Sequence, residues 1–281
     1  MHTTGQRGSR EVVVQCRGGG SNPYAVEPID LEAGPPKPDL PGTVVLRRTR
    51  DELFDAIAAD VFVQARACVQ AFGDFHLAVS AGDGLNPLYQ RLMYDPNLRS
   101  IPWKRTHLWL TCERCDPPPG TRSAQSQIEE LIVDPSDIPG TQVHFIPAAQ
   151  PDADIGYERD LRECLEWREK GHDRLDCVLL TLGSRGEIAG LNPGPPCTDD
   201  SGRLAVLTRD PTDQSAASVT MTQRLINASR FVGILAVGTA VRSVLARIES
   251  RRVSDAEVPV VGIDPVGGEL RWYVDSRAGG G

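Results

Sequence analysis

The sequence lacks long apolar runs, has few aromatic residues and carries no excess of positive charge. No stretch approaches the roughly 20 apolar residues of a membrane-spanning helix, and the first residues lack the apolar core of a signal peptide. Aromatic residues make up 5% of the 281 residues, and the formal net charge is −8. Nucleic-acid affinity comes mainly from clustered lysine and arginine, and the net negative charge does not favour such binding. We therefore expect a cytoplasmic protein whose partners are neither membranes nor nucleic acids; the oligomeric state stays open.

The cysteines do not have the spacing of a disulfide framework. Seven of them, an odd number, are scattered from position 16 to position 197. The one suggestive spacing is the CxxC of Cys112 and Cys115. A zinc site of that kind needs two further ligands at short spacing, and neither a second CxxC nor an HxxxH follows. We therefore expect no metal at these two cysteines.

Residues 1–42 differ in composition from the rest of the chain. They contain GGGSNP, GPPKP and LPG, with one short apolar patch at 12–14. Such a segment buries too little apolar surface to offset the entropy that ordering costs. We expect a flexible N-terminal extension over residues 1–42, followed by one domain over residues 43–281.

Strand and helix patterns alternate along that domain. Thr49 and Glu52 have the spacing of a helix-capping box, and Gly73 stands where the helix should end. Alternating strands and helices predict an α/β fold with a doubly wound, mainly parallel, Rossmann-like sheet covered by helices on both faces. Strands are predicted at 43–48, 75–80, 107–112, 175–183, 231–238, 258–263 and 270–275, and helices at 50–72, 87–95, 123–133, 157–170 and 239–250.

Three loops follow predicted strands of this sheet, at 80–87, 112–123 and 183–193. In the third, a buried apolar run ends in the glycine-rich turn GSRG, and Glu187 follows. Ligands of open α/β sheets bind beyond the carboxyl ends of the strands. We therefore expect the three loops to converge there, with Asp83, Arg114, Arg185 and Glu187 in one cleft.

Read together, the loops resemble the 6-phosphogluconolactonase family, which is related to glucosamine-6-phosphate deaminases. LAVSAGDGLNPLYQRL resembles the family's LSGGSTPLPLYRxL phosphate loop, and IPWKRTHLWLTCERCDPP resembles its WxxVHLFWGDERxVPP segment. LDCVLLTLGSRGEIAGLNPG resembles its FDLVLLGMGxDGHTASLFPG. The likeness keeps the same order from about Val44 to Ala278, which a lone glycine motif does not do.

The resemblance implies hydrolysis of 6-phospho-D-glucono-1,5-lactone to 6-phosphogluconate in the pentose phosphate pathway, without metal or cofactor. It also implies a sugar or sugar phosphate as ligand. The position of the family's catalytic base is occupied by Glu187. The implied substrate-binding positions are Ser80, Gly82, Asp83, Gly84, Glu113, Arg114, Arg185 and Gly186.

Several of these positions depart from the family's pattern. Glu187 stands in place of a histidine, Arg185 in place of an aspartate, and Asp83 in place of a small hydroxyl residue. A glutamate with its ordinary pKa of about 4.3 is a weak base at neutral pH unless burial raises that pKa. Three hypotheses follow. The chain is a lactonase, or it is a catalytically inactive or repurposed member that binds another sugar-like ligand or a protein partner. The third is a hydrolase for a differently charged lactone or sugar, with Asp83 and Arg185 changing the recognition loops.

Structural alternatives stand beside these roles. One alternative for Glu187 is an ion pair with Arg185 or Arg114 at a solvated rim. For Asp83, one alternative is to cap the helix that begins near Pro87. Another is an ion pair with Arg185 across the position where the family holds phosphate. Four histidines outside the three loops are expected to be structural or surface residues: His76, His107, His144 and His172. Trp109, Trp272 and Tyr273 lie in predicted strands and are expected to belong to the core.

Overall fold

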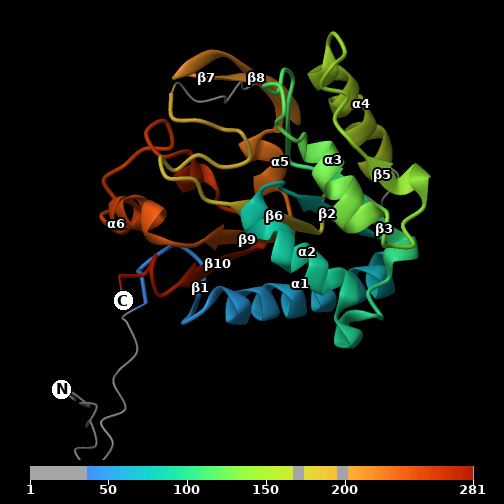
Figure 1. Ribbon diagram of the computed structural model, residues 1–281, viewed down its shortest axis with the longest axis horizontal. Coiled ribbons are helices and arrows are strands. Elements are labelled where there is room, and N and C mark those ends of the chain that lie inside the picture. The colour runs from blue at the N-terminus through green and yellow to red at the C-terminus, as the bar shows by residue number, and fades with distance from the viewer. Residues whose placement is uncertain (1–36, 167–173, 195–201, 281) are drawn as a thin grey trace, which may run out of the picture. The chain divides into compact units, whose positions relative to one another are not determined.

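The computed structural model describes residues 37–166, 174–194 and 202–280 (Figure 1). Most of the expected N-terminal extension, and His172, lie outside these residues. The extension was predicted to run to residue 42, but its described end packs on the domain. Leu40 is buried, and the Trp272 indole donates a hydrogen bond to the carbonyl of Pro41 (2.8 Å). Residues 40 and 41 therefore belong with the domain rather than with an extension.

The first helix, α1 (Arg50–Phe72), has the termini that the sequence predicts. The Thr49 hydroxyl accepts from the Glu52 amide (3.2 Å), and the Glu52 carboxylate accepts from the Thr49 amide (3.4 Å). Gly73 ends the helix in a left-handed conformation and donates its amide to Val69. This local chemistry confirms the predicted capping box.

The central sheet confirms the predicted parallel α/β fold. Every strand pair in it is parallel, and the middle strands are continuous buried apolar runs, as expected for a sheet covered on both faces. Within the described residues the order across the sheet is β1 (Thr43–Arg47), β10 (Glu269–Asp275), β9 (Phe231–Ala236), β6 (Cys177–Thr181), β2 (Phe75–Val79), β3 (Thr106–Leu110) and β5 (Val143–His144).

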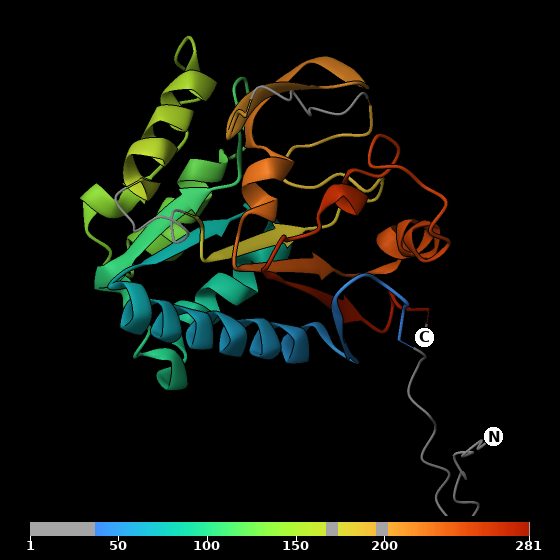
Figure 2. The same ribbon diagram turned by 180° about the vertical axis from the view of Figure 1, so that it is seen from behind.

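Helices lie on both sides of this sheet. In both views α1 runs along one face, and α5 lies on the opposite side (Figures 1 and 2). The second helix packs beside α1, where Arg91 pairs with Asp55 (2.9 Å). None of the described helices is long and apolar enough to cross a membrane. The further helices are α2 (Asn86–Tyr94), α3 (Ala124–Ile128), α4 (Ala153–Leu165), α5 (Gln223–Asn227) and α6 (Arg242–Glu249).

A second, antiparallel sheet was not predicted. It consists of β4 (Cys112–Arg114), β8 (Asp213–Met221) and β7 (Ala205–Asp210), in that order. The residues of β4 were predicted as the end of one strand and the start of a loop. This sheet brings residues near 210 and 218 beside the strand-end loops.

One further prediction of secondary structure was wrong. Residues 258–263 were predicted as a strand, but Pro259–Gly262 forms a 3-10 turn in which the Val260 amide donates to Gly186 (3.1 Å). A short apolar run does not distinguish a buried strand from a buried turn. The helix predicted at 123–133 divides into α3 and a π-helical turn, Glu129–Val133.

Candidate functional site

A cleft of about 330 Å³ opens at the carboxyl ends of three central strands. Ser80 follows β2, Thr111 follows β3 and Thr181 ends β6, so parallel strands bring these three side chains to one edge. Strand β4 and the loop to α3 form one wall, and Ala189 and Gly190 line the cleft from the third loop. The volume lies at the lower end of the range for small-molecule sites.

Two hydroxyl groups form the floor of the cleft. The Ser80 and Thr111 hydroxyl oxygens lie 2.9 Å apart in a hydrogen bond. The backbone of both residues is held as well, because the Tyr89 hydroxyl donates to the Ser80 carbonyl and the Thr220 hydroxyl donates to the Thr111 carbonyl (3.2 Å). The floor is therefore polar and fixed in position.

Glu113 anchors the wall of the cleft. Its side chain is buried, and its carboxylate accepts the backbone amides of Arg114 (3.0 Å), Ala124 (3.1 Å) and Gln125 (2.6 Å). Two of these amides belong to the start of α3, where helix geometry leaves amides without partners and favours a negative charge. Glu113 thus joins β4 to α3 and holds the intervening loop.

Positive charge in the cleft comes from Arg114 and Arg122. Arg114 projects from β4, and Arg122 lies at the end of the loop that precedes α3. The Arg122 guanidinium pairs with Glu130 and donates to the Ser126 carbonyl (3.2 Å). Guanidinium groups bind carboxylate or phosphate oxygens through charge-assisted hydrogen bonds. The cleft therefore suits an anionic ligand that also carries hydroxyl groups.

One amide of the first loop already has a partner within the protein. The Gly82 amide donates to the Gln127 side-chain carbonyl (3.1 Å), and the Gln127 amide group donates to Asn86. Asp83 is exposed on a short 3-10 turn, does not line the cleft and does not cap α2, contrary to the prediction. The positively charged side chains of the cleft are therefore on its wall and not in this loop.

The charged side chains of the third loop, Arg185 and Glu187, do not line the cleft. The Glu187 carboxylate accepts the Arg185 amide (2.7 Å) and lies against Gly183, where a side chain would meet the carboxyl carbon at 2.1 Å. Gly186 has a φ of +85°, and a Cβ there would lie 2.5 Å from the Val258 side chain. The left-handed backbone therefore requires glycine at Gly186, whereas a side chain at Gly183 would have to displace the Glu187 carboxylate.

Arg185 pairs with Asp210, so the predicted ion pair with Asp83 is wrong. The Arg185 guanidinium lies 3.1 Å from the Asp210 carboxylate and 3.2 Å from the Asn192 side-chain carbonyl. The guanidinium lowers the pKa of Asp210 below its usual range. Asp210 ends β7, in the sheet that was not predicted, so no local signal in the sequence pointed to it.

The structure brings about half of the predicted site residues together. Ser80, Gly82, Glu113 and Arg114 line the cleft, whereas Asp83, Gly84, Arg185, Gly186 and Glu187 do not. The lining also includes groups that sequence reasoning did not single out, namely Thr111, Arg122 and Gln127. Arg122 lay within the predicted second loop. Its positive charge close to a predicted helix start was the signal that could have marked it as a site residue.

Cys112 lines the cleft but is not an activated nucleophile. Burial raises the pKa of its thiol to about 12, so the thiol is protonated at neutral pH. Cys115 also has a raised pKa, mainly through burial, and both cysteines are free.

Comparisons with curated proteins find 6-phosphogluconolactonases. The chain is 30% identical over 211 residues to the 6-phosphogluconolactonase of Synechocystis sp., covering 74% of this chain and 84% of that protein. It is 29% identical over 272 residues to the human GDH/6PGL endoplasmic bifunctional protein, covering 90% of this chain. The match covers 33% of that relative, so the chain spans about a third of its length.

Solved structures share the fold. The 6-phosphogluconolactonase of Thermotoga maritima superposes with a TM-score of 0.69 at 22% identity, covering 83% of this chain and 99% of that one. The 6-phosphogluconolactonase of Trypanosoma brucei superposes with a TM-score of 0.69 at 21% identity, covering 85% of this chain and 98% of that one. A sequence model described as glucosamine-6-phosphate isomerases/6-phosphogluconolactonase matches residues 48–272. The chain belongs to this glucosamine-6-phosphate isomerase/6-phosphogluconolactonase family.

Proposed function

We propose that the protein binds a phosphorylated sugar acid, or its lactone, in the strand-end cleft. The observation that carries this proposal is the arrangement of Arg114 and Arg122 on the wall beside the hydroxyl pair of Ser80 and Thr111. Guanidinium groups suit a phosphate or carboxylate, and neutral hydroxyls suit a polyol chain. The relatives named 6-phosphogluconolactonase indicate 6-phosphogluconate and its lactone as the ligands to test.

Within this proposal, binding is the main activity, and lactone hydrolysis is slow or absent. The specific observation is the position of Glu187, the residue at the place of the family's base. A general base must reach the proton that it removes within hydrogen-bond distance, directly or through one water. The Glu187 carboxylate instead accepts the Arg185 amide and does not line the cleft.

A thermal-shift comparison of related ligands tests the proposal. A ligand that binds only the folded chain stabilises it by an amount that grows with concentration, about 2.7 kcal/mol at one hundred times Kd. We expect 6-phosphogluconate to raise Tm in this way and unphosphorylated gluconate to raise it much less. No shift with 6-phosphogluconate at millimolar concentration would refute the proposed ligand class.

Removing a cleft arginine is expected to weaken binding selectively. Arg114→Gln or Arg122→Gln should each raise Kd for 6-phosphogluconate about 10- to 150-fold, which corresponds to about 1.5–3 kcal/mol for a charge-assisted hydrogen bond. Arg209→Gln is the matched control, because Arg209 lines a neighbouring pocket instead. Calorimetric titration measures all three. Equal losses of affinity in all three variants would indicate long-range electrostatic attraction instead of a binding site in this cleft.

Restoring the family's histidine alone is not expected to create a lactonase. Glu187→His should leave lactone hydrolysis at the spontaneous rate, since the loop directs this side chain toward Gly183 and the Arg185 amide. Hydrolysis of 6-phosphogluconolactone is measured for wild type and variant, with 6-phosphogluconate binding as the control for folding. A gain of about 10²–10⁴ in rate, the usual effect of a general base, would contradict this account.

A further inference from the structure

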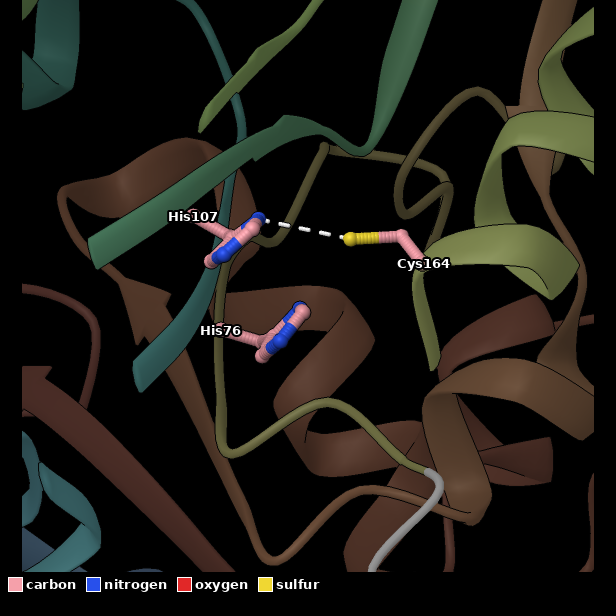
Figure 3. Close-up of side chains that lie close together, drawn as sticks. All are labelled: His76, His107 and Cys164. Atoms are coloured by element: carbon pink, nitrogen blue, oxygen red, sulfur yellow. Dashed lines mark hydrogen bonds between the residues drawn. The ribbon is translucent and has the colours of Figure 1, made fainter. Parts of the chain in front are cut away.

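A cluster of metal-ligating side chains lies away from the cleft, between the sheet and α4. His76 of β2 and His107 of β3 stack with ring centroids 4.5 Å apart, and Cys164 of α4 points toward His107 (Figure 3). The candidate ligand atoms of these three residues lie within 4.8 Å of one another. His76 and His107 are partners in strand register near the amino ends of β2 and β3, whereas the cleft lies beyond the carboxyl ends.

A fourth side chain, His144 of the edge strand β5, completes a close triangle of ligand atoms. His107 Nδ1 lies 3.0 Å from His144 Nε2 and 3.3 Å from Cys164 Sγ. The third side, from Cys164 Sγ to His144 Nε2, is 3.9 Å. Two strands and a helix therefore bring two nitrogens and one sulfur within 3.9 Å of one another.

We propose that His107 Nδ1, His144 Nε2 and Cys164 Sγ form a binding site for one zinc-class divalent ion. Zinc bonds of about 2.0–2.1 Å to nitrogen and about 2.3 Å to sulfur, at tetrahedral angles, place two nitrogens about 3.3 Å apart and nitrogen and sulfur about 3.6 Å apart. The three sides of the triangle each differ from these values by a few tenths of an ångström. The His107 and His144 rings lie in nearly parallel planes with centroids 5.3 Å apart, so each ring must also turn for its nitrogen to face the ion.

The donor set selects the class of ion. Imidazole and thiolate ligands favour zinc and its spectroscopic substitute cobalt, whereas magnesium and calcium require oxygen ligands. Binding converts the Cys164 thiol to a thiolate and releases its proton to solvent, while both imidazoles bind in their neutral form. A solvent molecule fills the remaining tetrahedral position. No oxidation or reduction takes place.

Neighbouring rings hold the ligands in place before an ion arrives. Trp109 stacks on His144 with centroids 3.8 Å apart, and its indole donates to His76 Nδ1 (3.2 Å). His76 in turn lies flat against His107, so it is a positioning residue for that ligand. His76 is buried, but His107, His144 and Cys164 are half-buried, which leaves the ligand atoms within reach of an ion from solvent.

The site would tie α4 to strands β3 and β5, and it lies away from the cleft, so it is independent of the proposed ligand binding. Cobalt titration of the metal-stripped full-length chain tests it. We expect about one ion per chain and an intense thiolate-to-cobalt absorption in the near ultraviolet, together with a raised Tm. Cys164→Ser should lose the absorption band, and His144→Gln should lower affinity by at least about 100-fold.

Cys115→Ser is the matched control and should keep both the ion and the absorption band, because Cys115 belongs to the CxxC on the cleft side. If a variant fails to fold, metal uptake by the wild-type chain still tests the proposal. If wild-type chain takes up no cobalt or zinc at micromolar concentration, the cluster is only hydrogen-bonded and the proposal is wrong. Loss of the band with Cys115→Ser instead of Cys164→Ser would also overturn it.

Discussion

Replacing Glu113 by alanine is expected to destabilise the protein by about 3–5 kcal/mol and to abolish measurable binding of 6-phosphogluconate. The change leaves three amides without their acceptor, and an unsatisfied buried amide costs about 1–3 kcal/mol. For a domain of this size, 1 kcal/mol shifts Tm by about 2–4 °C. The loop that carries Arg122 also loses its attachment to β4, so a cleft arginine is no longer held in position.

Denaturant unfolding and calorimetric titration measure the two effects separately. Glu130→Ala is the matched control, since Glu130 is an exposed glutamate paired with Arg122 at the surface, where such pairs contribute about 0–1 kcal/mol. If Glu113→Ala lowers the free energy of unfolding no more than Glu130→Ala does, Glu113 does not anchor the wall. Full stability with lost binding would instead assign Glu113 a direct contact with ligand.

Replacing Asp176 by alanine is expected to lower the free energy of unfolding by about 3–5 kcal/mol without a direct effect on the cleft. Asp176 is fully buried, and its carboxylate accepts the His76 amide (2.8 Å) and the Arg230 guanidinium (3.1 Å). Breaking a buried ion pair leaves the other charge desolvated, which costs more than the pair contributed. The Arg230 guanidinium also lies over the Phe72 ring (4.2 Å), and its side chain is only partly exposed.

Asp39→Ala provides the comparison for this second effect. Asp39 pairs with Arg251 at 3.3 Å, but both side chains are largely exposed, so the expected cost is below about 1 kcal/mol. Denaturant unfolding at neutral pH measures both variants. A cost for Asp176→Ala as small as that for Asp39→Ala would show that the buried charge is not decisive for stability.

Features that depend on short-range chemistry were predictable from the sequence. The capping box of Thr49 and Glu52, the helix end at Gly73 and the buried strands followed from residue types at fixed spacing. Parallel strands then placed Ser80 and Arg114 in one cleft through topology alone. The family resemblance added the order of the loops, which no single motif fixes.

Side-chain partners across the second sheet were not predictable in the same way. Arg185 was expected to meet Asp83, but β7 places Asp210 beside it from 25 residues away. Which of several carboxylates an arginine reaches depends on tertiary packing, and the antiparallel hairpin left no clear signal. The same holds for His144, whose partners on β3 and α4 lie 37 and 20 residues away in the sequence.

The most direct test of the proposed function is a crystal structure of the wild-type protein with bound 6-phosphogluconate. We predict that one anionic end of the ligand contacts the guanidinium groups of Arg114 and Arg122, with its hydroxyl groups over Ser80 and Thr111, while Glu187 stays on the Arg185 amide. Ligand density in the neighbouring pocket beside Arg209, or a Glu187 carboxylate turned onto the ligand's carboxyl carbon, would contradict this account.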